Sequence, residues 1–285
     1  MSDRLGPLKH LLPASLRFKI RRVLTASGDL LHPGIPPSHL RSHISPLWLD
    51  FLGTGRDQLE FMVELAGLTP SQRILDIACG VGRLALPLSH YLDERGSYEG
   101  FDVFAPGIEW CQRHISSRRS TFQFQVAQLS TPWSLGRGPT AEQYRFPHRD
   151  GEFDLAYAGS IFTHLVGDAA RNYLAESARV LKPGGRLVST WLLYNTKAIS
   201  LLPPQSIDKL WPRKLADCRA IATGPPEGSV LYDDVDVRSW FGERGFEIVE
   251  PFRVDATYNP ARKPAFDRTI GMNLYHSFSI IAVKR

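Results

Sequence analysis

Short apolar runs alternate with helical repeats through the middle of the chain. The apolar runs of strand length are residues 74–77, 98–102, 122–126, 153–158 and 186–191. The segments whose apolar residues recur every three or four positions are residues 83–93, 107–117 and 168–181. That spacing is typical of one helical face. Strands and helices that alternate in this order predict βαβ units, and therefore a parallel sheet with helices on both faces.

The C-terminal third completes this pattern after an interruption. Residues 197–230 form a Pro-rich insertion, which we expect to be a lid or substrate-binding segment. A helix over 234–244 follows, and then two strands over 246–254 and 277–283 with no long helix between them. Such a pair predicts an antiparallel hairpin. The expected fold is a Rossmann-like, doubly wound α/β sheet of seven mainly parallel strands, closed by that hairpin.

The residues before the sheet are expected to form a helical N-terminal extension or cap over 1–70, followed by the main domain over 71–285. A helix is predicted over 48–68. Residues 11–24 place apolar side chains on one helical face and arginine and lysine on the others, so this segment could lie on an anionic membrane surface. Its apolar stripe is short, which favours a terminal helix packed on the domain, or a mobile arm.

The first strand breaks into a turn of small residues over 78–82 and restarts as a helix. Such a turn presents backbone N–H groups to a polar or anionic ligand at the start of the helix. Gly80-x-Gly82-x-x-Ala85 also has the spacing of the dinucleotide-binding fingerprint. Asp102 follows it by about twenty residues, at the end of the second strand, as that fingerprint requires. Together these features predict a cofactor that contains a nucleoside, without saying which.

Composition and charge indicate which class of protein carries this cofactor site and which partners it has. Hydrophobic residues make up 43% and charged residues 22% of the 285-residue chain, which is ordinary for a globular protein. The net charge of +5 is not gathered into a basic block, so we expect no nucleic-acid partner. Three scattered cysteines favour a reducing compartment and no metal site. Signal-peptide and membrane-spanning patterns are absent from the sequence, so we expect a cytoplasmic location.

Several motifs in a fixed order resemble a known family. They are Asp76-x-Ala78-x-Gly80-x-Gly82, Asp102, the segment 153–155 that opens the fourth strand, and Leu181-Lys182-Pro183-Gly184-Gly185 before the fifth. With the closing hairpin, they resemble a class I S-adenosylmethionine-dependent methyltransferase. Within that family, the segments 100–111 and 160–165 resemble a bacterial-type, small-molecule subgroup. The resemblance covers residues 71–195 well and the C-terminal third loosely.

This resemblance implies S-adenosyl-L-methionine as the cofactor and gives roles to residues around the turn. Asp76 would approach the cofactor's amino group, and Asp102 would accept hydrogen bonds from both ribose hydroxyls. Gln128 stands where the family usually has an acid that accepts from the adenine amino group, and a glutamine carbonyl can still accept that bond. Ala78 replaces a glycine of the family's turn, a small change that should fit. The expected cofactor-binding residues are Asp76, Ala78, Cys79, Gly80, Gly82, Arg83, Asp102, Val103, Gln128 and Ser160.

Methyl transfer needs the acceptor's lone pair in line with the sulfonium–methyl bond, and holding two molecules in that geometry supplies much of the rate. A hydroxyl acceptor must also lose a proton, which favours a positioned base such as histidine. His164, after the fourth strand, is the expected catalytic residue, with a structural role in that loop as the alternative; His148 and His276 are weaker candidates. O-methylation of a small organic molecule is slightly favoured over N-methylation. We expect the acceptor site to be built from residues 35–55, from the loop 130–150 with Trp133 and Tyr144, and from the insertion 197–230 with Trp211.

Two other functions stay open on the sequence. An NAD-dependent oxidoreductase would use the same glycine spacing and Asp102, but Tyr157 and Tyr194 lack the lysine four residues later that a Tyr-x-x-x-Lys catalytic pair requires. A methyltransferase-like protein without turnover would only bind a cofactor or partner. The intact acids and glycines of the turn argue against it. The sequence does not indicate the oligomeric state or the identity of the acceptor.

Overall fold

The computed structural model describes residues 34–44, 50–132, 137–194, 204–250, 253–254 and 277–285. The chain divides into two compact units, Met1–Asp50 and Phe51–Arg285. The described part of the first unit contains one short helix, α2 (Ser38–Arg41), whose Arg41 Nε donates to the Pro36 carbonyl at 2.8 Å. The amphipathic segment predicted over 11–24 lies outside the described residues, and the predicted boundary near residue 70 stays a prediction.

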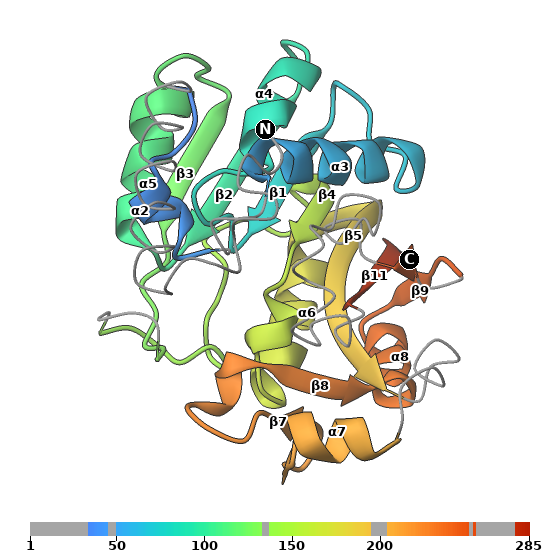
Figure 1. Cartoon of the computed structure of the whole chain (residues 1–285). Coiled ribbons are helices and arrows are strands. Elements are labelled where there is room, and N and C mark those ends of the chain that lie inside the picture. Colours follow the sequence, from blue (N-terminus) through green and yellow to red (C-terminus); the bar gives the residue numbers. More distant parts are fainter. Residues whose placement is uncertain (1–33, 45–49, 133–136, 195–203, 251–252, 255–276) are drawn as a thin grey trace, which may run out of the picture. The chain divides into compact units, whose positions relative to one another are not determined.

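A central sheet organises the second unit (Figure 1). Its first five strands are β1 (Arg73–Ile77), β2 (Ser97–Asp102), β3 (Phe122–Val126), β4 (Phe153–Ala158) and β5 (Leu181–Tyr194). They lie in the order β3-β2-β1-β4-β5, and all neighbouring pairs are parallel, as predicted. The chain runs outward from β1 to β3 and then returns to β4 on the other side of β1. Ligands of open α/β sheets bind beyond the carboxyl ends of the strands at such a reversal.

An antiparallel hairpin closes the sheet beyond β5, as the sequence predicts. β11 (Ser277–Lys284) pairs antiparallel with β5, and also with β9 (Phe246–Ile248) and β10 (Arg253–Val254). The strand predicted over 246–254 is therefore two short strands. The intervening sequence contains a proline, which has no N–H to donate to a ladder.

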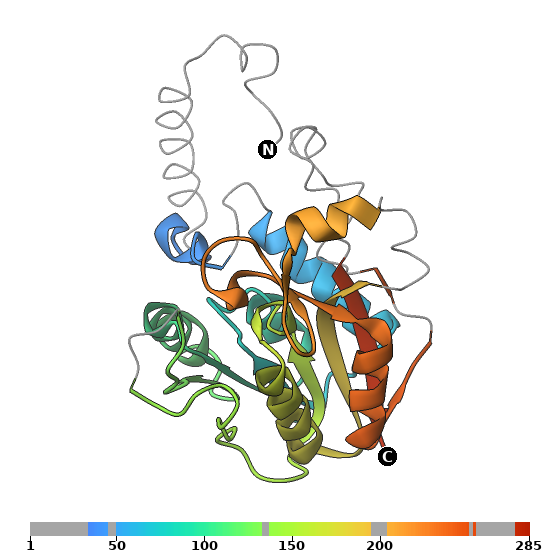
Figure 2. The same ribbon diagram turned by 90° about the horizontal axis from the view of Figure 1, so that it is seen from below.

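Helices cover both faces of the sheet (Figures 1 and 2). On one face lie α3 (Phe51–Glu64), α4 (Ala85–Tyr91) and α5 (Ala105–Cys111), which continues as a π-helical turn, Gln112–Ser116. On the other face lie α6 (Asp168–Val180) and α8 (Asp234–Glu243), whose buried residues share a hydrophobic cluster with the strands. These helices confirm the helical segments predicted along the sheet. No helix in the described part of the chain is long and apolar enough to cross a membrane.

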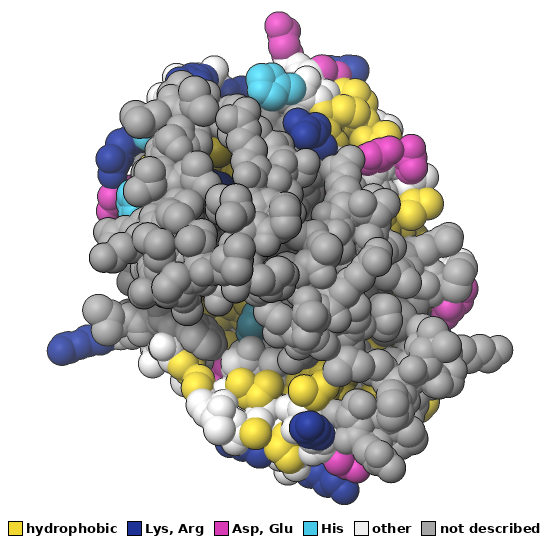
Figure 3. Space-filling view, viewed as in Figure 1, with side chains coloured by type: hydrophobic (Ala, Val, Ile, Leu, Met, Phe, Trp, Pro, Cys, Tyr) yellow, Lys and Arg dark blue, Asp and Glu magenta, His cyan; other side chains and the backbone are white. Residues whose placement is uncertain are grey.

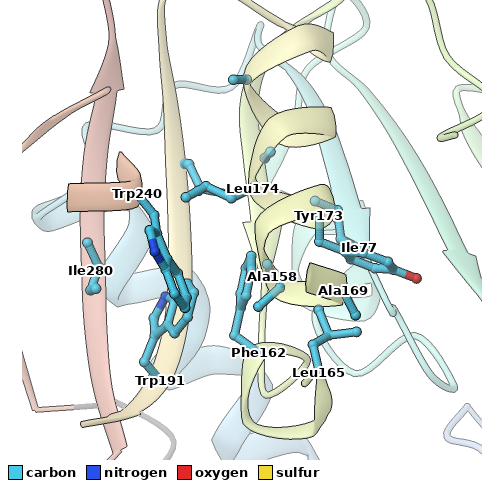
Figure 4. Packing of buried hydrophobic residues seen from close by; sticks show 14 of the residues in the cluster. Ile77, Ala158, Phe162, Leu165, Ala169, Tyr173, Leu174, Trp191, Trp240 and Ile280 are labelled. Atoms are coloured by element: carbon cyan, nitrogen blue, oxygen red, sulfur yellow. The ribbon is translucent and has the colours of Figure 1, made fainter. Parts of the chain in front are cut away.

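The cluster between the sheet and helices α6 and α8 is rich in aromatic side chains (Figure 4). Trp191 of β5 stacks on Phe162, with 4.1 Å between ring centroids, and meets Tyr232 edge-on at 5.5 Å. Trp240 of α8 and Tyr173 of α6 extend the cluster to either side. Fully burying a large hydrophobic side chain contributes about 1.5–3 kcal/mol. This layer therefore fixes β4 and β5, the strands on one side of the reversal.

β5 is longer than predicted. It begins at Leu181, directly after α6, whereas the sequence predicted a strand only from Arg186. The pairing with β4 skips this segment, because Phe153 lies opposite Leu181 and Leu155 lies opposite Arg186. Residues 182–185 therefore form a bulge within the strand. A bulge suits the proline of this segment, since proline cannot donate a ladder hydrogen bond.

The insertion at 197–230 adds strands that the sequence did not predict. Its described part contains α7 (Pro204–Leu210), β6 (Arg213–Lys214) and β7 (Arg219–Ala220), and it leads into β8 (Val230–Asp233). β8 runs antiparallel to β7 and parallel to the end of β5. In the described residues the sheet thus has eleven strands, and the predicted count of seven is wrong. The insertion's role as a lid stays a prediction.

Candidate cofactor site

The segment that joins β1 to α4 passes through three left-handed residues. The backbone φ angle is +61° at Ala78, +59° at Gly80 and +75° at Gly82. The turn is tied to β2, since the Cys79 N–H donates to a β2 carbonyl at 3.1 Å. A side chain at position 82 would place its Cβ 2.9 Å from the Cys111 sulfur, so glycine is required there. The structure therefore confirms a tight turn of small, largely buried residues between the strand and the helix.

Asp102 ends β2 and faces this turn. Its Oδ2 accepts a hydrogen bond from the Gly80 N–H at 2.8 Å, and its Oδ1 accepts one from the Phe104 N–H at 2.8 Å. Burial raises the pKa of its carboxyl, although these hydrogen bonds oppose the rise. Each carboxylate oxygen has a second lone pair. Asp102 can therefore accept two more hydrogen bonds, as from the two hydroxyls of a ribose.

Asp76 lies near the end of β1 and is only 3% exposed. Its Oδ2 accepts a hydrogen bond from the Tyr98 hydroxyl at 2.6 Å. Burial raises its pKa from 3.8 to about 7, while the Tyr98 hydrogen bond and the charge of Arg83 act in the opposite direction. A positive ligand group beside this carboxyl would favour its ionised form. The site thus contains an acid suited to a cationic partner.

Arg83 follows the turn. Its Nε is buried and makes no hydrogen bond among the described residues. Helix α3 packs closely here, because a Cβ built on Gly55 would lie 2.5 Å from the Arg83 carbonyl oxygen. The backbone of Arg83 is therefore held in place while its side chain keeps an unused donor. An anionic ligand group such as a carboxylate could accept from that donor.

Three further residues expected at the cofactor follow neighbouring strands. Val103 comes directly after Asp102 and is partly exposed, and Gln128 is exposed two residues after β3. Ser160 follows β4 with a φ angle of +64°, and its N–H donates to the Thr190 hydroxyl at 2.5 Å. Because the strands are parallel, the structure brings these residues to the same carboxyl edge of the sheet as the turn.

His164 ends a short 3-10 turn (Phe162–His164) after β4, and its side chain is exposed. Its Nδ1 is 2.7 Å from the Glu227 carbonyl oxygen, in the 3-10 turn Pro226–Gly228 of the insertion. A carbonyl oxygen only accepts, so Nδ1 carries the proton and the lone pair of the neutral ring lies on Nε2. The insertion thus fixes the tautomer that a general base at Nε2 needs.

Known proteins match this part of the chain. A family model described as a methyltransferase domain matches residues 74–185. A 2-phytyl-1,4-naphtoquinone methyltransferase of Synechocystis is 28% identical over 151 residues, which are 51% of this chain and 58% of that protein. A ubiquinone/menaquinone biosynthesis C-methyltransferase of Shewanella piezotolerans is 26% identical over 192 residues, 67% of this chain and 66% of that protein. The chain therefore spans just under two thirds, or less, of these relatives' lengths.

Solved structures show the same fold. Magnesium protoporphyrin IX methyltransferase of Synechocystis, solved with bound SAH, is 17% identical with a TM-score of 0.50, over 82% of this chain and 86% of that chain. Residues 74–185 match a methyltransferase domain, and their fold is that of the SAM-dependent methyltransferases. The match to a methyltransferase domain supports S-adenosyl-L-methionine as the cofactor. The comparisons give no support to an NAD-dependent oxidoreductase.

The described residues of the methyltransferase domain fit this cofactor, which carries a ribose, an amino group and a carboxylate. Asp102 has lone pairs available for ribose hydroxyls. Asp76 is a buried acid suited to an amino group, and the buried Arg83 Nε is a donor suited to a carboxylate. The turn between Asp76 and Arg83 contains three of the smallest residues, Ala78, Gly80 and Gly82.

Two residues of the methyltransferase site were missed by sequence reasoning. Tyr98 looks like an ordinary aromatic residue of β2. The available signal was Gly100, which lies opposite Asp76 in the β1–β2 register and leaves space beside the carboxylate. Glu227 acts on His164 through its backbone carbonyl, which no sequence pattern marks.

Two of the aromatic residues expected in the acceptor site, Tyr144 and Trp211, are core residues, and Trp133 lies outside the described residues. Tyr144 is buried and lies edge-on to Phe101, with 5.9 Å between ring centroids. Trp211 is buried within the insertion, where its Nε1 donates to the Ser229 hydroxyl at 3.1 Å. Both have small exposed areas because their rings complete the packing of the segments that contain them.

Of the two weaker histidine candidates, His148 does not join the site. His148 is buried, and its Nδ1 lies 3.3 Å from Glu99, where it supports the sheet. His276 lies outside the described residues. Hydrophobic side chains do gather over the insertion, along the lower edge of the face in Figure 3, and the partly buried Ile207, Leu210 and Ile221 belong to this segment.

Proposed function

We propose that the protein is an enzyme that transfers the methyl group of S-adenosyl-L-methionine to a small organic acceptor. The observation that carries this proposal is the Asp102 carboxylate, held 2.8 Å from the Gly80 nitrogen at the carboxyl ends of β1 and β2. This arrangement combines a ribose acceptor with the glycine turn at the point where strand order reverses. The methyltransferase names of the matched relatives support the same reaction.

The proposed cofactor roles are those that the family resemblance implies. Asp102 accepts from the ribose hydroxyls, Val103 lies against the adenine, and Gln128 accepts from the adenine amino group. Asp76 faces the amino group of the cofactor, and Arg83 faces its carboxylate. The residues proposed to line the rest of the site are Ala78, Cys79, Gly80, Gly82 and Ser160.

The cofactor supplies an electrophilic methyl group on a positively charged sulfur. The protein's part is to hold the acceptor in line with the sulfur–methyl bond and to take up the acceptor's proton. His164 is the proposed base. When its Nε2 takes the proton, the Nδ1–H continues to donate to the Glu227 carbonyl, so the imidazolium is stabilised where it forms. A positioned base favours a hydroxyl acceptor, and hence O-methylation over N-methylation.

A second candidate is methylation of a ring carbon. The matched relatives are named for a naphtoquinone and for C-methylation in quinone biosynthesis. In a hydroxylated ring, ionisation of the hydroxyl makes the neighbouring carbon nucleophilic, so the same base would serve either reaction. The hydrophobic side chains over the insertion support an acceptor with apolar surface.

Calorimetry followed by product analysis tests the proposal. We expect S-adenosylhomocysteine to bind and NAD to give no heat of binding. Methyl-labelled cofactor is then offered with a hydroquinone, a catechol and an aromatic amine, and mass spectrometry assigns the methylated atom. We expect label on oxygen or ring carbon of the hydroxylated rings. Binding of NAD but not S-adenosylhomocysteine would overturn the proposal.

A further inference from the structure

We propose that Tyr98 is a positioning residue for the amino-acid end of the cofactor, because its hydroxyl holds the Asp76 carboxylate where the cofactor's amino group would bind. This inference rests on the proposed function. It assigns a role to a buried tyrosine that does not belong to the glycine turn.

The Tyr98 ring is rigidly placed. It is fully buried, and it stacks on Phe122 with 5.1 Å between ring centroids and 13° between ring planes. In the β1–β2 register Tyr98 lies opposite Ile74, two positions before the residue opposite Asp76. Diagonal neighbours on one face of a sheet are within reach of a long aromatic side chain. The hydroxyl therefore reaches Asp76 Oδ2 at 2.6 Å from a ring that cannot shift.

A missing side chain makes this contact possible. The residue directly opposite Asp76 is Gly100. A Cβ at position 100 would lie 3.0 Å from the Tyr98 hydroxyl oxygen and 2.9 Å from the Cys79 sulfur. The space between the two strands thus holds the hydroxyl and the carboxylate only because position 100 is glycine. This one hydrogen bond therefore depends on Asp76 of β1 and on Tyr98 and Gly100 of β2.

The hydrogen bond also controls the charge of Asp76. The charged and titratable groups that act on Asp76 or lie beside it are Tyr98 and Asp102 from β2, Arg83 and Cys79 from the turn, and Cys111 from α5. The two thiols are buried, and burial raises their pKa, so they stay neutral. Asp102 disfavours ionisation of Asp76, while Tyr98 and Arg83 favour it. Removing the Tyr98 hydroxyl therefore moves Asp76 toward its neutral form, which attracts an ammonium group less.

The experiment compares two ligands on Tyr98→Phe, which keeps the ring and removes the hydroxyl. S-adenosylhomocysteine carries the amino-acid portion, and 5′-methylthioadenosine lacks it. Calorimetry at pH 7.5 should show about threefold weaker binding of S-adenosylhomocysteine, because a rise of about one pKa unit from about 7 lowers the ionised fraction of Asp76 about threefold, with 5′-methylthioadenosine unchanged. Between pH 6 and 8, the preference for S-adenosylhomocysteine should fall as Asp76 becomes protonated. In the variant this fall should occur at higher pH.

Tyr91→Phe is the matched control, since its hydroxyl donates to the Leu68 carbonyl at 2.8 Å at the end of α4. It should leave the ratio of the two affinities unchanged. Gly100→Ala should weaken S-adenosylhomocysteine selectively, as Tyr98→Phe does, because its Cβ displaces the hydroxyl. If Tyr98→Phe does not fold, two other measurements test the role of Tyr98. They are the ratio of the two ligand affinities in Gly100→Ala and the pH dependence of that ratio in the wild type.

An affinity ratio in Tyr98→Phe equal to that of the wild type across the pH range overturns this inference while leaving the proposed function intact. A wild-type protein that binds neither ligand overturns the proposed function instead. A selective loss in both Tyr98→Phe and Gly100→Ala supports the positioning role.

Discussion

Acidic side chains have different partners at the two edges of the sheet. At the amino edge, Arg73 Nη2 lies 2.5 Å from Glu99 and 2.7 Å from Glu152, and Lys182 Nζ lies 2.6 Å from Asp154. At the carboxyl edge, the two acids accept from a tyrosine hydroxyl and from main-chain N–H groups. Neither of those two acids is in an ion pair with another described residue.

This difference separates residues that support the fold from residues that await a ligand. The hydrogen bonds of His148 and Arg73 hold the pKa of Glu99 below its ordinary value. Burial instead raises the pKa of Asp76 to about 7 and also raises that of Asp102. Acids whose pKa values are raised by burial at one end of a sheet are candidates for binding chemistry rather than for stability.

The largest effect should come from the proposed base at the carboxyl edge. We expect His164→Ala to lower kcat at least 100-fold, because general base catalysis typically contributes factors of about 100 to 10,000. The Kd of S-adenosylmethionine should not change. Steady-state kinetics and calorimetry measure the two quantities, with His90→Ala, an exposed histidine of α4, as the control. Turnover near the wild-type value in His164→Ala would remove His164 from the catalytic role.

A matched pair of substitutions tests the two edges directly. Asp102→Ala should raise the Kd of S-adenosylhomocysteine about 100-fold, since it removes the acceptor of two ribose hydrogen bonds, each worth about 1.5–3 kcal/mol when charged. Asp154→Ala removes an acid that accepts from Lys182 and from the Arg73 N–H at 2.8 Å. It should lower the free energy of unfolding by about 1 kcal/mol and leave the Kd unchanged. Equal effects of the two variants on Kd would contradict the comparison.

Stability against pH should differ in sign between the edges. Because folding raises the Asp76 pKa to about 7, the stability that its neutral form contributes is lost as pH rises from about 4 through 7. The free energy of unfolding of Asp76→Asn should therefore exceed that of the wild type by about 2 kcal/mol at pH 8. The difference should vanish near pH 4. Urea denaturation across this range measures it.

Glu99→Gln is the control for that pH series. Folding lowers the Glu99 pKa, so its carboxylate contributes stability above the unfolded pKa that is lost as pH falls through the folded pKa. The variant should be less stable than wild type near pH 7, and the gap should narrow in acid. A Glu99→Gln protein that gained stability with rising pH relative to wild type would contradict the contrast.

The smallest effect concerns backbone strain. Ala78 has a φ angle of +61°, a region that costs a non-glycine residue about 1–2 kcal/mol. Ala78→Gly should raise the free energy of unfolding by about 0.5 kcal/mol, since glycine loses part of the gain through greater unfolded-state entropy. Gly151→Ala, at a φ angle of +63° before β4, should act in the opposite direction. Thermal unfolding of the two variants checks both signs.

Much of the fold could be predicted because its signals are local. The apolar runs matched β1 to β4 closely, and Gly80, Gly82 and Asp102 marked the cofactor end of the sheet. The bulge at 182–185 could not be predicted, because proline and glycine suggest a turn as readily as a bulge. Pairing with β4 decides between them, and pairing depends on residues far away in the sequence.

The other failures also arose from contacts between distant segments. The Tyr98–Asp76 bond depends on the register of two strands and on Gly100 between them. Tyr144 and Trp211 were assigned to the acceptor site from their residue type alone. Burial determines their role, and a single aromatic residue in a loop does not reveal whether its ring faces inward or outward.

The insertion has a consequence for any attempt to change the acceptor by exchanging this segment with that of a relative. Its 3-10 turn contacts His164 through the Glu227 carbonyl, and β8, directly after it, pairs with the end of β5. A graft that replaced the whole segment would therefore alter the protonation geometry of His164 and expose the side of β5 at the same time. Chimeras that retain residues 226–233 and exchange only the preceding part should keep both.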